Sequence, residues 1–317
     1  QEDRLIGERQ IQRLAGTEQE AMARTWATLK LKALGFQNIR IEPFEMKGWV
    51  RGEEKAEITA PYPHKLAITA LGHSGTTPAN GLTGTVVVYS TYADFLAAPD
   101  AAIKGKIVYV GHAMGRTQDG SSYSVFGRVR REGPAVAAKR GAAAFLIRSI
   151  GTDDHRTPHT GVMRYEDGVA RIPHAALAPE DAGRIAREVA RGRPVTLRLE
   201  MSAAERGVAT NRNIIAEIRG REKPDEVVVL GGHIDSWDVG QGAQDDGGGC
   251  VAAWEAVRWM KKLGLRPRRT VRCVLWTQEE WGGRGAQGYR DAHVAELGRH
   301  IVALEADAGT FTPKGFG

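Results

Sequence analysis

The sequence predicts an α/β protein whose mostly parallel, mixed sheet is covered by helices on both faces, with a second, smaller α/β module inserted in the chain. Three observations support this prediction. Apolar strand patterns alternate with helical patterns after residue 213, a similar alternation fills residues 82–201, and the 317 residues are enough for two domains. Strands that are apolar at nearly every position are typical of sheets buried on both faces.

The first segment predicts a helix followed by strands. Residues 17–34 begin with the capping pair Thr17 and Glu20, and Gly35 ends the pattern. Apolar side chains recur on one expected face of this helix: Met22, Trp26, Leu29 and Ala33. Strand patterns follow at residues 38–46, 49–61 and 65–71. From about residue 75 the chain becomes rich in Gly, Thr and Pro, which indicates a domain boundary.

The middle of the chain predicts a self-contained α/β module. Strand patterns occur at residues 84–90, 105–114, 143–149 and 195–201. Helix patterns occur at residues 133–142 and 179–192. We therefore expect residues 79–201 to form an inserted domain, while residues 1–78 and 202–317 together form the main domain.

The last part of the chain predicts a second α/β unit. Buried-strand patterns occur at residues 213–218, 226–235, 270–276 and 300–307. Helix patterns occur between them at residues 247–263 and 285–297. In sheets of this class, catalytic groups gather at the carboxyl ends of the strands. The residues that follow these strands are therefore the first candidates for a functional site.

Composition argues against several classes of protein. The net charge of +6 comes from arginines spread along the chain, without the aromatic interleaving or motif of a nucleic-acid binder. No window approaches the roughly 18 apolar residues of a membrane helix, and the N-terminus lacks a secretory signal pattern, which leaves the compartment open. The two cysteines, Cys250 and Cys273, lie in apolar runs and predict packed thiols. We expect neither nucleic acid nor membrane as a partner.

Acids and one histidine follow three strands of the last unit. These residues are His233 and Asp235 after the first strand, Glu279 and Glu280 after the second, and Asp307 after the third. Asp245 and Asp246 lie in a loop before the next helix. Because carboxylates packed this closely repel one another, a divalent cation is the simplest way to keep them ionised. Imidazole and carboxylate ligands without thiolate favour zinc or a similar first-row ion over magnesium or calcium.

Two short spacings in this group indicate separate roles. Successive side chains at a strand end point in different directions, so one member of the pair Glu279 and Glu280 can bind metal while the other faces a substrate as a base. Asp235, two residues after His233, can accept the free ring N–H of a ligating histidine and fix its tautomer. Each fragment alone occurs by chance, whereas their coincidence after three strands favours a metal site.

Three strings, GGHIDSWDVGQGAQDDGGG, LRPRRTVRCVLWTQEEWGG and ALEADAGTF, resemble the family M28 zinc peptidases, most closely the carboxypeptidase Q (plasma glutamate carboxypeptidase) group. The resemblance extends over nearly the whole chain. It implies a zinc-exopeptidase fold in which the insert is a protease-associated domain. By this resemblance His233 and Asp307 would bind one zinc ion. Asp245 would bridge to a second ion, which Glu280 would also bind.

The same resemblance implies a reaction. Glu279 would act as general base and acid on a metal-activated water, Asp235 would support His233, and the peptide bond from Asp245 to the next residue would be cis. The implied substrates are unblocked dipeptides or short peptides, cleaved one residue from an end. A homodimer and a secreted or periplasmic setting are likewise implied.

One departure from the family pattern leaves alternatives open. The family supplies a last histidine ligand from a loop beyond the Asp307 position, but no histidine follows His300. We therefore expect this sequence to be an N-terminal part of a longer enzyme, with His293 and His300 at helix-face and strand-entry positions. The alternatives are a single-zinc acyltransferase such as a glutaminyl cyclase, or a non-catalytic peptidase-like binding module. The adjacent pair Asp245 and Asp246 argues against the first, and the filled ligand positions argue against the second.

Overall fold

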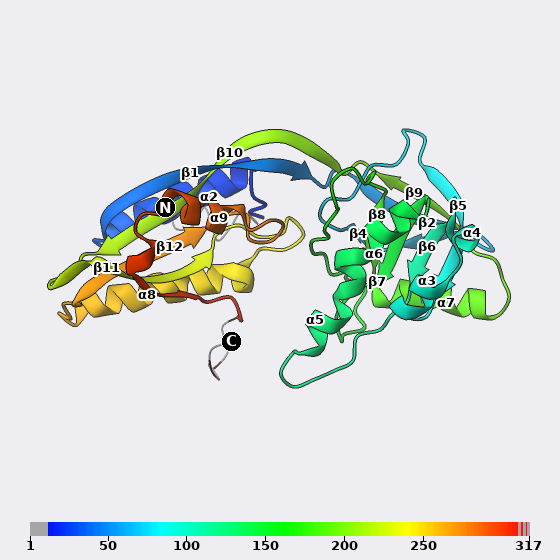
Figure 1. Ribbon diagram of the computed structural model, residues 1–317. Coiled ribbons are helices and arrows are strands. Elements are labelled where there is room, and N and C mark those ends of the chain that lie inside the picture. The colour runs from blue at the N-terminus through cyan, green and yellow to red at the C-terminus, as the bar shows by residue number, and fades with distance from the viewer. Residues whose placement is uncertain (1–11, 310–311, 313–314, 316–317) are drawn as a thin grey trace. The chain divides into compact units, whose positions relative to one another are not determined.

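The chain folds as two compact units (Figure 1). The computed structural model describes residues 12–309, 312 and 315. Unit 1 takes its described residues from Gln1–Gly48 and Gly207–Gly317, and unit 2 is Trp49–Arg206. The first boundary therefore lies 30 residues before the expected one at residue 78, since 78 − 48 = 30.

Unit 1 is built on a mixed sheet with five described strands. In spatial order they are β1 (Gln37–Val50), β10 (Ala204–Ile218), β12 (Arg269–Trp276), β11 (Lys223–His233) and β13 (His300–Glu305). β11 runs parallel to both β12 and β13, whereas β10 runs antiparallel to β12. The predicted mixed α/β sheet is confirmed for this unit, with its parallel strands grouped together.

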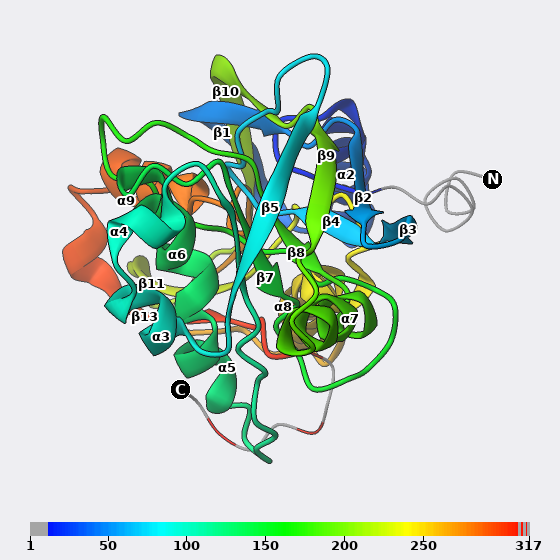
Figure 2. The same cartoon turned by 90° about the vertical axis from the view of Figure 1, so that its right-hand side faces the viewer.

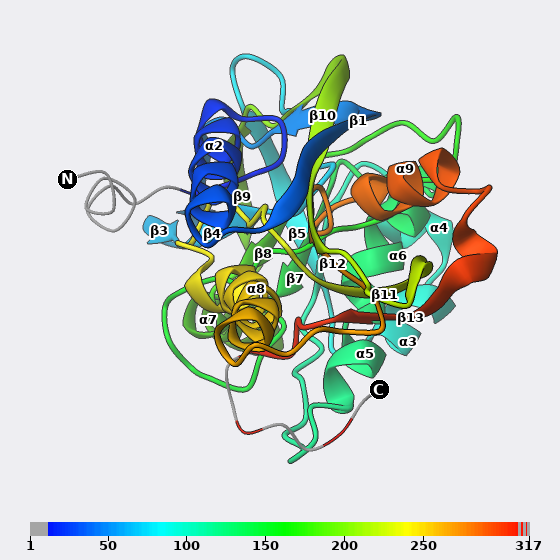
Figure 3. The same cartoon turned by 90° about the vertical axis from the view of Figure 1, so that its left-hand side faces the viewer.

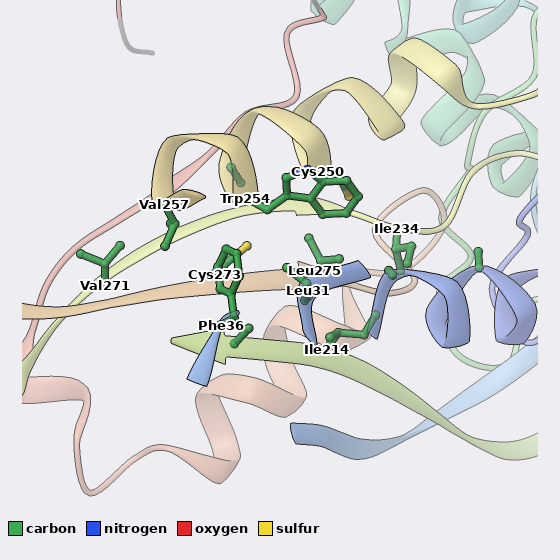
Figure 4. Close-up of a cluster of buried hydrophobic side chains, with 14 residues drawn as sticks. Leu31, Phe36, Ile214, Ile234, Cys250, Trp254, Val257, Val271, Cys273 and Leu275 are labelled. Carbon is green, nitrogen blue, oxygen red and sulfur yellow. The ribbon is translucent and has the colours of Figure 1, made fainter. Parts of the chain in front are cut away.

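Helices cover both faces of this sheet (Figure 3). α2 (Glu18–Ala33) and α8 (Gly248–Lys262) share a core with one face, and α9 (Arg284–Ala292) packs on the other face through Tyr289. The core under α2 and α8 includes Leu31, Ile214, Trp254, Val257, Cys273 and Leu275 (Figure 4). Two short helices, η1 (Ala243–Gly247) and η2 (Leu297–Arg299), lead into α8 and β13.

The ends of α2 follow the sequence prediction. The side-chain oxygen of Thr17 accepts a hydrogen bond from the backbone N–H of Glu20 at 3.2 Å, which satisfies one of the free N–H groups of the first turn. Gly35 follows the helix with a φ of 76°, a conformation that glycine adopts without steric cost.

The buried face of α2, by contrast, is not the predicted one. Met22 and Leu29, which the sequence places on one apolar face of the helix, are 43% and 55% exposed. The buried positions are Glu20, Ala23, Ala27 and Leu31. Small alanines allow the helix to approach the sheet closely, so the larger Trp26 packs at the margin against Trp254, with ring centroids 5.8 Å apart.

Both cysteines are buried free thiols, as the sequence predicts. Cys250 lies on α8 and Cys273 on β12, and both belong to the core of that face. The Cys250 thiol donates to the backbone oxygen of His233 at 3.2 Å. These thiols are packing groups, and burial raises the pKa of both.

Unit 2 is built on a larger mixed sheet. In spatial order its strands are β3 (His64–Leu66), β2 (Glu54–Ala60), β9 (Thr196–Met201), β5 (Leu82–Tyr89), β6 (Ile107–Val110), β7 (Ala144–Arg148), β8 (His174–Leu177) and β4 (Ile68–Ala70). Strands β5 to β8 run parallel to one another, and the other strand pairs of the sheet are antiparallel. Because β2 pairs with β9 and β4 with β8, residues 54–70 belong to this unit and not to the main domain.

Helices also flank the sheet of unit 2 on two sides. They are α3 (Tyr92–Ala97), α4 (Asp100–Ile103), α5 (Ser122–Phe126), α6 (Arg128–Lys139) and α7 (Pro179–Ala190). In Figure 2, α3 and α6 lie on one side of the parallel strands and α7 lies on the other. No helix in the described part of the chain has both the length and the apolar character to span a bilayer.

Candidate metal centre

The candidate site forms where three parallel strands end. β11 lies between β12 and β13, with His233 opposite Trp276 and Gly231 opposite Glu305. The ladder continues beyond β13, because the backbone N–H of Ala306 donates to the oxygen of Gly231 at 2.9 Å. The segments that leave β12 and β13 therefore emerge on either side of His233, as expected for the carboxyl edge of a parallel sheet.

Glycines allow α8 to reach this edge. A Cβ atom on Gly232 would lie 2.5 Å from the backbone nitrogen of Cys250, and one on Gly249 would lie 1.6 Å from the oxygen of Ala306. No side chain fits at such distances, so both positions require glycine. The glycine-rich strings around His233 and after Asp246 thus bring the start of α8 against the ends of β11 and β13.

Three candidate ligands converge here. The Nε2 atom of His233 lies 3.1 Å from Oδ1 of Asp245 and 3.4 Å from Oδ1 of Asp307. The ligand atoms of these residues all lie within 4.8 Å of one another. The imidazole is fully buried, whereas the side chains of Asp245 and Asp307 are 67% and 43% exposed. Among residues 12–309, 312 and 315 this is the only such group of three potential ligands.

The donor set fits a divalent cation. His233 Nε2 is buried with two carboxylate oxygens close by, but neither makes a hydrogen bond of good geometry to it. Burial lowers the pKa of His233, yet Asp245 and Asp307 beside the ring outweigh it and raise the pKa to about 12. Surroundings that stabilise the positively charged imidazolium this strongly are equally suited to a metal cation.

Asp235 holds the opposite side of the imidazole. The Nδ1 atom of His233 lies 3.0 Å from the backbone oxygen of Asp235 and 3.7 Å from its carboxylate. That carboxylate accepts a hydrogen bond from the backbone N–H of Glu279 at 3.1 Å. Asp235 therefore bonds to the ring through its backbone oxygen, whereas the sequence had indicated the carboxylate. With Nδ1 as the donor, Nε2 is the nitrogen that faces the other ligands.

Glu279 and Glu280 turn to different partners. Oε2 of Glu279 lies 4.0 Å from His233 Nε2, so this side chain faces the candidate ligands. Oε1 of Glu280 accepts a hydrogen bond from the backbone N–H of Trp237 at 3.2 Å. Burial raises the pKa of Glu279 to about 7 and that of Glu280 to about 9, with nearby aspartates adding to the effect. A carboxyl group that titrates near neutrality is suited to accept and return a proton.

Asp246 has a structural role beside the ligands. Its buried carboxylate accepts hydrogen bonds from the backbone N–H groups of His233 and Gly249, both at 2.9 Å. The peptide bond from Asp245 to Asp246 is cis, as the family resemblance implies. Asp246 thus ties β11 to the start of α8, while its neighbour Asp245 faces the imidazole.

His293 and His300 lie away from this edge. Nε2 of His293 lies 2.7 Å from a carboxylate oxygen of Glu42, and Nε2 of His300 lies 2.7 Å from the hydroxyl of Tyr289. His300 begins β13, whereas Asp307 follows the end of that strand. His300 occupies the strand-entry position that the sequence predicts, whereas His293 is the C-cap residue that follows α9 (Arg284–Ala292) and does not lie on a helix face.

Sequence patterns did not identify Arg13, which lies against the loop between His233 and Asp245. The partners of its guanidinium are backbone oxygens. Carbonyl groups are present at every residue and leave no signature in a sequence. An isolated arginine more than 200 positions away from its partners therefore offered no signal.

Known proteins resemble this chain over nearly its whole length. Residues 213–315, which contain all the candidate site residues, match Peptidase family M28. The crystal structure of a peptidase M28 precursor from Shewanella amazonensis SB2B has a TM-score of 0.92 and 42% sequence identity, and the match covers 96% of this chain and 69% of that chain. This chain belongs to peptidase family M28.

The chain spans only part of the length of further relatives that it matches. It is 42% identical to carboxypeptidase Q from Bos taurus and 41% identical to that from Homo sapiens. Each match covers 96% of this chain but 63% of the relative's length. BSAP, a zinc aminopeptidase from Bacillus subtilis, has a TM-score of 0.66 at 20% identity, covering 93% of this chain and 65% of that chain, and shows the shared fold alone.

Proposed function

We propose that this M28 chain is the metal-binding part of a zinc exopeptidase. The observation that supports the proposal most is the convergence of His233, Asp245 and Asp307 within 4.8 Å at the carboxyl edge of β11 and β13. Membership of family M28 supports it, as does the fold shared with a zinc aminopeptidase. Few arrangements other than a cation site explain a buried imidazole between two carboxylates at such a strand edge.

The proposed metal ligands follow from the geometry and the family resemblance. His233 and Asp307 would hold one zinc ion, and Asp245 would bridge it to a second ion, to which Glu280 would also bind. When bound, zinc supplies Lewis acidity, which polarises a carbonyl group and lowers the pKa of water. Asp235 keeps the Nε2 atom of the imidazole turned toward the ligand position.

Glu279 is the proposed proton carrier. Its carboxylate faces His233 at 4.0 Å, and burial raises its pKa to about 7. In water near neutral pH the group can therefore accept a proton from the attacking water and return it to the leaving amine. The backbone N–H of Glu279 is held by Asp235, which fixes the start of this segment beside the imidazole.

The proposed substrates are unblocked dipeptides or short peptides that lose one residue from an end. The relatives' names include both carboxypeptidase Q and leucine aminopeptidase 2, the latter from Trichophyton equinum, so the substrate panel must present both peptide ends. We also propose that unit 2 is the protease-associated domain expected from the sequence, with the bounds Trp49–Arg206. The homodimer and the secreted or periplasmic setting remain predictions from the family resemblance.

Loss of the bridging carboxylate tests the metal assignment. Asp245→Ala should reduce bound zinc at both positions and weaken zinc affinity by more than about 10-fold, the least that loss of a mere ligand-supporting partner costs. Zinc content is measured by elemental analysis after dialysis. Asp153→Ala, which removes an exposed carboxylate from unit 2, is the control and should retain full zinc.

The activity assay separates the peptidase from its rivals. The purified chain is incubated with zinc and a panel of free, N-terminally blocked and C-terminally amidated dipeptides, with and without a chelator. Chelator-sensitive release of amino acids from free dipeptides is the expected result. Cyclisation of N-terminal glutamine would indicate the acyltransferase, and zinc binding without any turnover would indicate a binding module. Full zinc content in Asp245→Ala would contradict the bridging assignment.

A further inference from the structure

An arginine on the segment before α2 holds the loop that joins two of the candidate ligands. We name residues 234–244 the ligand loop. The guanidinium of Arg13 donates from Nε to the backbone oxygen of Ile234 at 2.7 Å. Its Nη1 and Nη2 atoms donate to the backbone oxygens of Gln241 and Gly242 at 2.7 and 2.8 Å. One side chain thus joins both ends of the loop.

The backbone of Arg13 adds a second set of contacts to the ligand loop. Its N–H donates to the hydroxyl oxygen of Ser236 at 3.0 Å, and its carbonyl oxygen accepts from the backbone N–H of Ser236 at 3.0 Å. The arginine is therefore fixed to the loop at its backbone as well as at its side chain. Such a double attachment limits the freedom of both segments.

The anchored positions adjoin the ligands themselves. Ile234 follows His233 directly, and Gly242 lies three residues before Asp245. Holding these two positions together constrains where the chain leaves the imidazole and where it approaches the carboxylate. The distance of 3.1 Å between His233 Nε2 and Asp245 Oδ1 therefore depends on Arg13, although the hydrogen bonds of Arg13 go to the loop and not to either ligand side chain.

The turn at Gly242 packs closely against the side chain of Arg13. Gly242 has a φ of 61°, and a Cβ atom there would lie 2.7 Å from Nη2 of Arg13 and 2.3 Å from the Cβ of Ser236. Its backbone oxygen also accepts from the N–H of Gly247 at 2.9 Å, close to the start of α8. Both the glycine and the arginine are needed for this tight approach.

Positive charge is a second property of Arg13, and its effect has to be distinguished from that of the guanidinium hydrogen bonds. Burial lowers its pKa, while Cys250, Asp235 and Asp246 act in the opposite direction, so the guanidinium lies near several acidic groups of the site. A lysine would keep the positive charge but, as a single ammonium on a flexible stem, could not span three carbonyl oxygens in a fixed plane. Lysine and glutamine substitutions therefore distinguish the two contributions.

We propose that Arg13 is a positioning residue that sets the placement of His233 and Asp245 and thereby the affinity of the site for zinc. The inference rests on the proposed zinc site. It assigns no direct contact with metal or substrate to Arg13. Because the guanidinium acts through the ligand loop, its loss should weaken metal binding although every ligand side chain is still present.

The test compares the zinc dissociation constants of the full chain and its variants, measured by competition with a chromophoric chelator. Arg13→Lys and Arg13→Gln should both raise the dissociation constant by about 10- to 100-fold, the range typical of groups that support metal ligands. At saturating zinc, most of the wild-type kcat should return in both variants. Recovery of wild-type affinity by lysine alone would mean that charge, not position, matters and would overturn the proposal.

A matched control exists in unit 2. Arg140 donates to the backbone oxygens of Phe95 and Ala98 and pairs with Asp100 at 2.6 Å, so it is an arginine of the same kind that has its partners within the other unit. Arg140→Lys should lower the unfolding temperature by an amount similar to Arg13→Lys yet leave zinc affinity unchanged. Equal losses of zinc affinity in both variants would show that general destabilisation, not positioning, is responsible.

A milder variant keeps the test decisive if Arg13 substitutions do not fold. Ser236→Ala removes the bond between the Ser236 hydroxyl and the Arg13 backbone, and should weaken zinc binding a few-fold; unchanged affinity in this variant would count against the proposal. A wild-type chain that binds zinc without cleaving peptides would refute the peptidase function, while the comparison of Arg13 variants would still decide the inference. A wild-type chain that binds no zinc would refute both.

Discussion

Unit 1 contains three parallel strands and unit 2 contains four, but the residues at their ends differ. In unit 1, β11, β12 and β13 lead into His233, Glu279 and Asp307. In unit 2, β7 and β8 lead into Ser149 and Ala178, whose backbone N–H groups donate to neighbouring backbone oxygens at 2.9 Å. An imidazole and two carboxylates therefore converge at the strand ends of unit 1, whereas the described residues of unit 2 contain no such group of three potential ligands.

Buried polar atoms without a hydrogen-bond partner occur in both units. In unit 2 the buried Arg130 donates to the backbone oxygen of Thr160 at 3.0 Å and to the hydroxyl of Tyr123 at 2.9 Å, while its Nε atom has no hydrogen-bond partner. In unit 1 the buried Nε2 of His233 has no hydrogen-bond partner, and burial raises the pKa of Glu280 to about 9. A parallel sheet thus offers a place for a site, and the side chains that converge at the strand ends decide whether the place is used.

The largest of the predicted effects concerns Glu279. Glu279→Gln should reduce kcat by about 10²- to 10⁴-fold, because the amide cannot accept a proton, while zinc content should remain that of the wild type. Steady-state kinetics and elemental analysis measure the two quantities. Glu132→Gln, an exposed glutamate paired with Arg128 in unit 2, is the control and should be fully active. Normal turnover in Glu279→Gln would contradict the proposed catalytic role of Glu279 at this edge of unit 1.

A second, smaller effect concerns a buried acid of unit 1. Glu20 is buried on α2 beside Arg24, whose Nε lies 2.8 Å from its carboxylate, and burial raises the pKa of Glu20 from 4.5 to about 7. Because the folded-state pKa is the higher one, the stability that Glu20 contributes is fully present below pH 4.5 and is lost as the pH rises through about 7. Glu20→Gln should therefore be more stable than the wild type at pH 8, by on the order of 2 kcal/mol.

Denaturant unfolding at pH 4.5 and pH 8 measures this difference. Tryptophan fluorescence reports chiefly on unit 1, since Trp254 belongs to the core under α2 and Trp26 packs against it, while Trp49 is the one tryptophan in the sequence of unit 2. The stability gain of the variant should shrink toward zero at pH 4.5. A gain of equal size at both pH values would mean that the charge of Glu20 is not its cause.

The smallest expected effect has the opposite sign and lies in unit 2. His174 is buried on β8, and burial lowers its pKa from 6.5 to about 4. Because the folded-state pKa is the lower one, the stability of the neutral imidazole is present above pH 6.5 and is lost as the pH falls toward 4. Between pH 7.5 and pH 5.5 the wild type should therefore lose about 1 kcal/mol more than His174→Phe.

Hydrogen exchange of the β7 and β8 amides, corrected for intrinsic rates, measures the free energy of opening in unit 2. The amides of β10 in unit 1 provide the internal reference. We expect the free energy of opening to change with pH in opposite directions in the two units. Parallel trends in both variants and wild type would show that neither Glu20 nor His174 governs the pH response of its unit.

Much of unit 1 could be predicted because its strands are apolar at nearly every position and its acids follow them directly. The place of His233, Glu279 and Asp307 at one edge required only that β11, β12 and β13 be parallel neighbours, which the structure has. The two thiols and the end positions of α2 followed from equally local rules. Local sequence patterns were thus enough to predict most of the residues that meet at this edge.

Other features depend on contacts that no local pattern encodes. α2 buries Ala23 and Ala27 instead of Met22 and Leu29, because close packing against the sheet favours small side chains over the more apolar ones. The first boundary was misplaced because the strands within residues 54–70 find their partners more than 100 residues later, at β9 and β8. Pairings of that kind are decided by tertiary packing.

The unequal exposure of the three candidate ligands would impose an order on metal capture at the proposed site. The side chain of His233 is fully buried, whereas those of Asp245 and Asp307 are partly exposed. An ion that arrived from solution would meet the two carboxylates first and the imidazole last. The encounter would then depend on ionic strength, while retention would depend on the buried nitrogen. Uptake and release of the ion would in this way be separate kinetic properties of one small cluster.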